Sequence, residues 1–347
     1  MKTKWVWAIV VFVLAGLLVA SSVLAGCAAP APAPAPAPQP TGAAKPEPPK
    51  PAAGKTMIRW GTSSVGSTGY NVSAKMTDIV NRYTNIEASI TPVGGAEATV
   101  RAINRGERDL GFGNTHAVYD GYNGVGTFAK EGKQPILLVA MVYTSTMTFL
   151  GQPGITSVPE FKGKTVSYRR APSPLFTVFG DVVLKAYGMD PDKDVKNVTT
   201  LELREITDAM KTGSIDAGMI PGAIPGTTIP ELFEAKPFNI IDLGKDKADA
   251  IAKQSPFMMP YLIKANTFKT LTKDAYTMGF VNVLCSKADL PENVVYEITK
   301  AVFSHLDELA GADPVAKRIT AEFAAKDPVI PFHPGALKYY KEAGVIK

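Results

Sequence analysis

The stretch MIRWGTSSVGSTGY at residues 57–70 decides the fold class. Residues 57–60 are a short apolar strand candidate, and a loop of mostly small residues follows at 61–69. Apolar positions between Ala74 and Val80 then indicate a helix. A strand that runs through a short loop into a helix is the repeating unit of an α/β protein. The glycine spacing does not match a dinucleotide-binding fingerprint, and the loop lacks the lysine of a P-loop.

The loop at 61–69 allows two interpretations. Small residues just before a helix leave backbone N–H groups free, and the positive end of the helix dipole favours an anion. The loop would then bind a carboxylate. The alternative is a plain strand-to-helix connection, and the residues alone do not separate the two.

The same alternation continues along the chain and predicts largely parallel sheets in two α/β units. Further strands are expected at 88–92, 110–112, 136–142, 165–168, 198–203, 217–220, 238–243 and 276–285. Helices are expected after Gly94-Gly95 and at 174–187, 205–212, 291–310 and 314–325. We expect lobe one to comprise 56–145 and about 256–347, and lobe two about 146–255. A cleft between two such lobes is a usual place for a small ligand.

The N-terminal segment indicates export. Lys2 and Lys4 precede an apolar run at residues 5–24, as in a secretory signal, and Leu24-Ala25-Gly26-Cys27 resembles a bacterial lipobox. We therefore expect residues 1–26 to be a signal peptide and Cys27 to carry lipid. An uncleaved membrane anchor is the alternative. Residues 27–55 are rich in alanine and proline, which favours an extended tether from the membrane.

Composition excludes several classes of function. The 347 residues include 37 basic and 32 acidic side chains, a net charge of +5 without a basic stripe for nucleic acid. Two cysteines and three histidines give no zinc site or disulfide framework. No nucleophile–base set is visible, so we expect no catalytic residue, metal or cofactor. His305 is interpreted as structural, His333 as a capping or turn residue, and Cys285 as a small buried apolar residue.

Several motifs together resemble the TAXI family of solute receptors for TRAP (tripartite ATP-independent periplasmic) transporters. They are GTSSVGSTGY at 61–70, GGAEATVRAINRGERDLGF at 94–112, AVYDGYNG at 117–124 and IPFHPGALKYYKEAG at 330–344. The resemblance implies a two-lobed type II periplasmic-binding-protein fold that closes on a solute. It also implies delivery of that solute to a membrane permease driven by an ion gradient. A sensor lipoprotein of the same fold is the alternative, and an exported enzyme is a third, weaker hypothesis.

The resemblance implies a carboxylate ligand, such as an organic acid or glutamate. The expected binding residues are Ser63, Ser64, Ser67, Thr68, Tyr70, Gly94, Gly95, Asn114, Thr115, His116, Tyr143, Arg169, Arg170 and Ser173. Family members often have Gln-Ser-Asp where this chain has residues 114–116, so His116 replaces an acid. That replacement favours an organic acid over an amino acid, whose ammonium needs a carboxylate partner. Arginine can bind a carboxylate through two hydrogen bonds, although both arginines could instead be surface charges.

Overall fold

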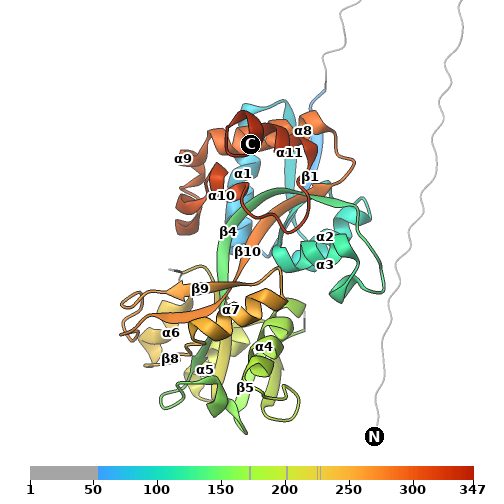
Figure 1. The fold of residues 1–347 in the computed structure, drawn as a ribbon. Helices are drawn as coiled ribbons and strands as arrows, with labels where there is room; N and C mark the ends of the chain where they lie inside the picture. Colours follow the sequence, from blue (N-terminus) through green and yellow to red (C-terminus); the bar gives the residue numbers. More distant parts are fainter. Residues whose placement is uncertain (1–53, 172, 201, 225, 227) are drawn as a thin grey trace, which may run out of the picture. The chain divides into compact units, whose positions relative to one another are not determined.

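A computed structural model describes residues 54–347 except 172, 201, 225 and 227 (Figure 1). The predicted signal peptide, the lipidation site Cys27 and nearly all of the tether lie outside these residues. None of the helices in the described part of the chain has both the length and the apolar character needed to cross a membrane.

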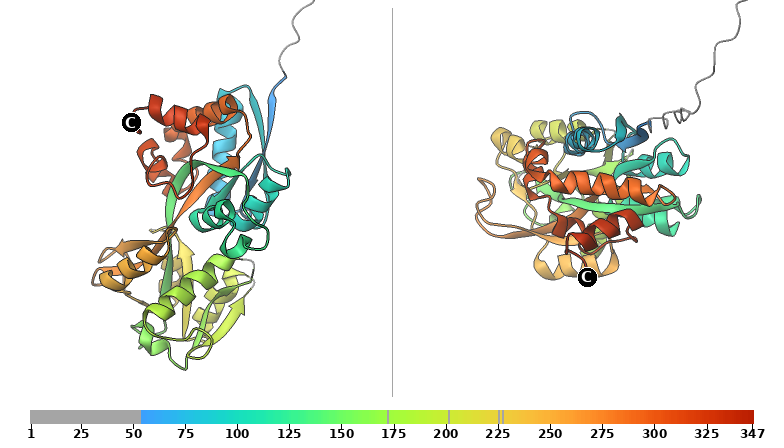
Figure 2. Two further views of the ribbon diagram at one scale, coloured as in Figure 1. Left: turned by 45° about the vertical axis from the view of Figure 1, so that its right-hand side comes forward. Right: turned by 90° about the horizontal axis from the view of Figure 1, so that it is seen from above.

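The described strands form one mixed sheet of ten strands, in the order β2-β1-β3-β10-β4-β7-β5-β6, with β8 paired to β4 and β9 to β10. Its strands are β1 (Thr56–Thr62), β2 (Ile86–Pro92), β3 (Leu110–Asn114), β4 (Ile136–Gly151), β5 (Thr165–Arg170), β6 (Lys196–Thr200), β7 (Ala217–Gly222), β8 (Asn239–Ile240), β9 (Met259–Ile263) and β10 (Ala275–Lys287). The long strands β4 and β10 run through both lobes and join them (Figure 2).

Helices cover both faces of the sheet in each lobe. In lobe one they are α1 (Thr68–Tyr83), α2 (Ala96–Asn104), α3 (Thr115–Asn123), α8 (Glu292–Ser304), α9 (Leu306–Leu309), α10 (Ala321–Ala324) and α11 (Pro334–Glu342). In lobe two they are α4 (Pro174–Ala186), α5 (Leu203–Thr212), α6 (Thr228–Ala235) and α7 (Lys245–Gln254). Three short 3₁₀ helices complete the described elements: η1 (Gly126–Phe128), η2 (Val158–Phe161) and η3 (Pro314–Arg318).

Each lobe has its own hydrophobic core. In lobe one, α1, α8 and α11 pack on one face of the sheet around the fully buried Trp60, and α2 and α3 pack on the other face. The core of lobe two is centred on Tyr168 and Phe179, which are also fully buried. Met258 and Phe280 belong to this second core, so the returning chain contributes to lobe two before it re-enters lobe one. The lobe boundaries expected from the sequence remain a prediction.

The prediction of largely parallel sheets is wrong at the centre. Strands β1, β2 and β3 are parallel, as are β5, β6 and β7, but β10 is antiparallel to β3 and β4, and β4 is antiparallel to β7. The physical reason is the double crossover. The chain passes from lobe one to lobe two in β4 and returns in β10, so the two strands that hydrogen-bond to each other must run in opposite directions.

Four predicted elements differ clearly in their bounds from the observed ones. The helix expected at 291–310 is divided into α8 and α9, because His305 has a non-helical backbone (φ −130°, ψ 40°). The helix expected at 314–325 is η3 followed by the four residues of α10. The strand expected at 238–243 is only the two residues of β8, and the one expected at 198–203 ends at Thr200.

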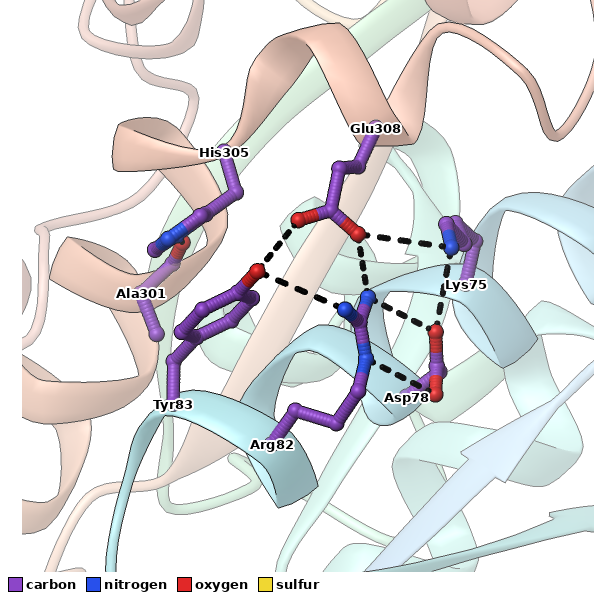
Figure 3. Close-up of polar contacts among 7 residues, drawn as sticks. All are labelled: Lys75, Asp78, Arg82, Tyr83, Ala301, His305 and Glu308. Atoms are coloured by element: carbon purple, nitrogen blue, oxygen red, sulfur yellow. Dashed lines mark hydrogen bonds and ion pairs between the residues drawn. The ribbon is translucent and has the colours of Figure 1, made fainter.

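Two of the three histidines have the structural roles expected of them. His333 is the N-cap of α11, where its side chain accepts a hydrogen bond from the backbone N–H of Gly335 at 3.2 Å. His305 stacks on Tyr83 with ring centroids 3.6 Å apart (Figure 3). Next to this pair, Glu308 of α9 accepts hydrogen bonds from Tyr83 and Arg82 of α1. These contacts attach the C-terminal helices to the first helix of the fold.

Candidate functional site

Strand direction places the candidate site between the lobes. β3 and β4 are both antiparallel to β10, so both run toward lobe two, and β1 and β2 are parallel to β3. In lobe two, β7 is antiparallel to β4, and β5 and β6 share the direction of β7, so these three strands run toward lobe one. The carboxyl ends of both sets of strands therefore face the region between the lobes. Helices α1, α2, α3 and α4 begin at those ends.

These four helices differ in whether a side chain caps the backbone N–H groups at their N-termini. Ser67 caps α1 by accepting from the N–H of Tyr70 at 3.2 Å, and Asn114 caps α3 in the same way. The N-cap residues of α2 and α4, Gly95 and Ser173, make no side-chain capping bond. Two helix starts, one in each lobe, thus lack a side-chain cap for their first N–H groups.

The start of α2 needs glycine for conformational reasons. Gly94 and Gly95 have φ angles of 93° and 142°, a range that L side chains rarely adopt. No atom lies within 4 Å of the position that a Cβ would take at either residue. The two glycines therefore leave the backbone bare at the inter-lobe end of lobe one.

The hydroxyl groups of the loop before α1 mainly bond to the loop itself. The Oγ atoms of Ser63 and Ser67 lie 2.9 Å apart, and Ser67 Oγ also lies 2.7 Å from the carbonyl oxygen of Ser64. Thr68 and Tyr70 lie in the first turn of α1. Val65, at the tip of the loop, is 71% exposed. These hydrogen bonds fix the shape of a loop that exposes Val65 at its tip.

Thr115 lies at a contact between the lobes. Its Oγ1 donates to the carbonyl oxygen of Phe257 at 3.0 Å and accepts from the N–H of Val281 at 3.3 Å. Both hydrogen-bonding roles of this hydroxyl are therefore taken in this structure. The contact ties the start of α3 to the chain that returns from lobe two.

His116 is enclosed rather than directed toward a ligand. Its ring is 2% exposed, with Nδ1 3.3 Å from Glu97 Oε1 and Nε2 3.3 Å from Asp120 Oδ2, and Phe257 packs edge-on against it at 4.8 Å. Each ring nitrogen therefore faces one carboxylate oxygen. His116 therefore turns neither ring nitrogen toward a ligand in this structure.

Glu97 and Asp120 were not singled out from the sequence. An acidic residue in the first turn of a helix is a common response to the helix dipole, so Glu97 gives no separate signal. Asp120 lies within the motif at 117–124, which indicates the family but no role for this residue. Its carboxylate also accepts from the N–H of Thr127 at 3.0 Å, which orients it toward His116.

Tyr143 lies where β4 leaves lobe one. Asn282 of β10 is the register partner of Tyr143 in β4 and of Asn114 in β3. Tyr143 and Asn114, both predicted to bind the ligand, therefore lie on either side of the same residue of β10. The Tyr143 ring packs against Phe112 with centroids 5.9 Å apart and is only 5% exposed. Burial, together with the charge of Asp313, raises the pKa of Tyr143, so its hydroxyl stays protonated.

The two arginines at the end of β5 have different surroundings. The Arg169 Nη2 lies 3.1 Å from Asp181 Oδ1 and 2.8 Å from Asp192 Oδ1, so its guanidinium already has two carboxylate partners. Arg170 stacks over Phe176 at 5.1 Å and lies 3.7 Å from Glu202. Burial lowers the pKa of Arg170 below its usual value, although nearby carboxylates oppose the shift. Arg170 therefore holds the more desolvated charge, four residues before the first residue of α4.

A pocket of about 220 Å³ opens beside Thr115, between lobe-one residues 323–329 and residues 256–259 of the returning chain. The hydrogen bond from Thr115 to Phe257 forms part of its wall. In the part of the chain that the structure describes, no group of three or more His, Cys, Asp or Glu side chains is placed to hold a metal ion. The described residues thus offer helix starts, one half-buried arginine and an apolar pocket.

The fold defines the class as a two-lobed periplasmic binding protein of type II. The model of the NMT1-like family matches residues 60–344, and the chain belongs to that family. This places it among the periplasmic solute-binding proteins, which are receptors.

Solved structures with some similarity bind different solutes. The alkanesulfonate-binding protein SsuA from Xanthomonas axonopodis pv. citri, bound to MOPS, is 15% identical, with a TM-score of 0.45 over 85% of this chain and 82% of that one. The sugar acid binding protein DctPAm from Advenella mimigardefordensis, in complex with galactonate, is 13% identical, with a TM-score of 0.41 over 84% and 85%. A TRAP periplasmic solute binding protein from Rhodobacter sphaeroides is 12% identical, with a TM-score of 0.43 over 84% and 91%. At these values the similarity assigns no solute to this chain.

Proposed function

We propose that this protein is a TAXI-type solute receptor. It captures a small carboxylate, an organic acid or an amino acid, outside the cytoplasm and delivers it to a TRAP-type permease driven by an ion gradient. Lipid on Cys27 holds it at the membrane, and the proline-rich segment lets the two lobes stand off the surface. The sequence motifs at 61–70, 94–112 and 330–344 support the family, and the geometry between the lobes supports an anionic ligand.

One observation carries the anion proposal: strand carboxyl ends and helix N-termini from both lobes face the same region. Ligands of α/β sheets bind at the carboxyl ends of strands, and helix N-termini favour negative charge. The starts of α2 and α4 lack side-chain caps, and Arg170 adds a partly desolvated positive charge nearby. We therefore assign anion binding to the starts of α2 and α4 and to Arg170. We assign Arg169 a structural role, in which it pairs with Asp181 and Asp192.

A charge reversal at the start of α4 tests the anion site. Ser173→Asp keeps a good N-cap residue but places a carboxylate where the ligand's carboxylate is expected. Repulsion at about 5 Å costs about 1–3 kcal/mol, or roughly 5- to 150-fold in affinity. Ser173→Asn is the matched control, because it caps equally well without charge. A ligand is first found by thermal-shift screening of organic and amino acids, since binding raises Tm. Equal affinity of the Asp and Asn variants would remove the start of α4 from the site.

The anchor and the transport step need separate experiments. Cys27→Ala should abolish lipid labelling and slow processing of the precursor, and normal labelling of that variant would contradict the anchor. Purified receptor loaded with solute should drive uptake into vesicles that contain a TRAP permease only when an ion gradient is applied. Binding without any transport would instead favour a sensor lipoprotein.

A further inference from the structure

Thr200, the last residue of β6, buries a hydroxyl group that the packing leaves unused. The residue is 5% exposed, and within the described part of the chain its hydroxyl oxygen has no hydrogen-bond partner. Other buried hydroxyls of lobe two are bonded: Ser167 Oγ donates to the carbonyl oxygen of Val198 at 2.9 Å, and the Oγ1 atoms of Thr146 and Thr148 lie 3.0 Å apart. A buried polar group without a partner costs free energy, so its presence calls for an explanation.

The sheet places this hydroxyl beside the proposed anion site. Arg170 and Thr200 are register partners in the parallel strands β5 and β6, so they lie roughly 5 Å apart and their side chains point to the same face of the sheet. On that face Arg170 stacks over Phe176 of α4. The carbonyl oxygen of Thr200 also accepts from the N–H of Ala171 at 3.0 Å, which ties the end of β6 to the loop before α4. Thr200 is therefore part of the same turn of structure as the start of α4.

Most backbone N–H groups at the start of α4 are already engaged. Pro174, the first residue of the helix, has no N–H. The N–H of Ser173 donates to the carbonyl oxygen of Arg170 at 3.0 Å, and the N–H of Phe176 donates to that of Ser173 at 3.1 Å. An anion at this helix start therefore needs side-chain donors as well. Arg170 supplies a guanidinium, and the hydroxyl of Thr200 is a neutral donor next to it.

We propose that Thr200 is a further binding residue of the anion site, whose hydroxyl donates a hydrogen bond to the carboxylate that Arg170 and the start of α4 also meet. The proposal rests on the proposed function and deepens it with a residue outside the motifs that resemble the TAXI family. The hydroxyl is covered in this structure, so the solute reaches it after a local side-chain movement. The ion pair between Arg170 and Glu202 opposes such a movement only weakly, because it is 3.7 Å long and the Glu202 side chain is 74% exposed.

Calorimetry on the full chain tests the hydroxyl with Thr200→Val, which keeps the shape of the side chain and removes its oxygen. The probes are acetate, succinate, citrate, L-glutamate and L-leucine. The valine variant should bind the tightest of these about 10- to 150-fold more weakly, the range expected for a hydrogen bond to a charged group. Its Tm without solute should be equal or higher, because an unpartnered buried hydroxyl is lost. Thr200→Ser keeps the hydroxyl and should restore most of the affinity.

Thr199→Val is the matched control for position. It makes the same substitution one residue earlier, at an exposed side chain of β6, and should change neither affinity nor Tm. Arg170→Gln tests whether both residues meet one group. If they share a carboxylate, the affinity loss of the double variant should be smaller than the product of the two single losses. Losses that simply multiply would place Thr200 away from that carboxylate and overturn the proposal.

The remaining outcomes separate this proposal from the receptor function. If the native protein binds a probe and Thr200→Val binds it equally well, the role of Thr200 is wrong and the receptor function stands. A lower Tm of Thr200→Val, or an affinity loss that Thr200→Ser does not restore, would assign Thr200 a structural role instead. Failure of the native protein to bind any of the probes would overturn the carboxylate receptor and this proposal with it.

Discussion

Replacement of Arg169 by glutamine should destabilise lobe two without changing solute affinity. Its Nη2 contacts Asp181, which also accepts from the hydroxyl of Tyr168 at 2.8 Å, and Asp192. The side chain of Asp192 is 74% exposed, so that ion pair contributes less than about 1 kcal/mol. The side chains of Arg169 and Asp181 are only 22% and 24% exposed, and their charge-assisted hydrogen bond contributes about 1–2 kcal/mol. Together they predict a decrease in Tm of roughly 2–6 °C.

Urea unfolding and calorimetry on the same preparation separate the two possible roles. A contact between Arg169 and an anionic ligand would cost about 2–5 kcal/mol of binding, or roughly 30- to several-thousand-fold in affinity. We expect Arg169→Gln to change the solute affinity by less than about twofold. Arg204→Gln, at a side chain that is 88% exposed, should alter neither stability nor binding. An affinity loss of 30-fold at native stability would refute the structural assignment and return Arg169 to the binding site.

Three further measurements test the fold. Gly180→Ala should cost about 1–3 kcal/mol of unfolding free energy, because its Cβ would lie 1.9 Å from Cδ2 of the fully buried Tyr168 ring; a variant as stable as the native protein would contradict this packing. Burial raises the pKa of Cys285 to about 12, so the thiol of the native protein should not react with a disulfide reagent at pH 8. It should react only after unfolding in urea, and rapid reaction of the native protein would show that the site opens. Hydrogen bonds from Arg82 and then Tyr83 lower the pKa of Glu308 from 4.5 to about 2, so its contribution to stability is present above pH 4.5 and is lost as the pH falls toward 2. In the Glu308→Gln variant, the free energy of unfolding should depend less on pH between 4.5 and 2. If this pH dependence is unchanged, the contacts of Glu308 with Arg82 and Tyr83 do not contribute to acid unfolding.

Local sequence patterns determine much of this fold. The strand at 57–60, the glycine-rich start of α2 and, to within one residue, the bounds of α4 follow from apolar periodicity and turn residues, which act within a few positions. The capping role of His333 and the burial of Cys285 are also local, because each depends on its immediate neighbours and on hydrophobicity. The class of periplasmic solute-binding proteins follows from motifs whose order along the chain can be read without a structure.

Only the tertiary structure decided which groups are free to meet a ligand. His116 and Arg169 are candidate ligand-binding residues in the sequence, yet the fold brings two carboxylates to each of these side chains. The pocket beside Thr115 depends on a hydrogen bond to Phe257, 142 residues away. No periodicity or spacing encodes such a contact, because it depends on β4 and β10 running in opposite directions between the lobes. How far neighbouring groups already engage a charged side chain depends on segments that are distant in the sequence, so it is set by the whole fold.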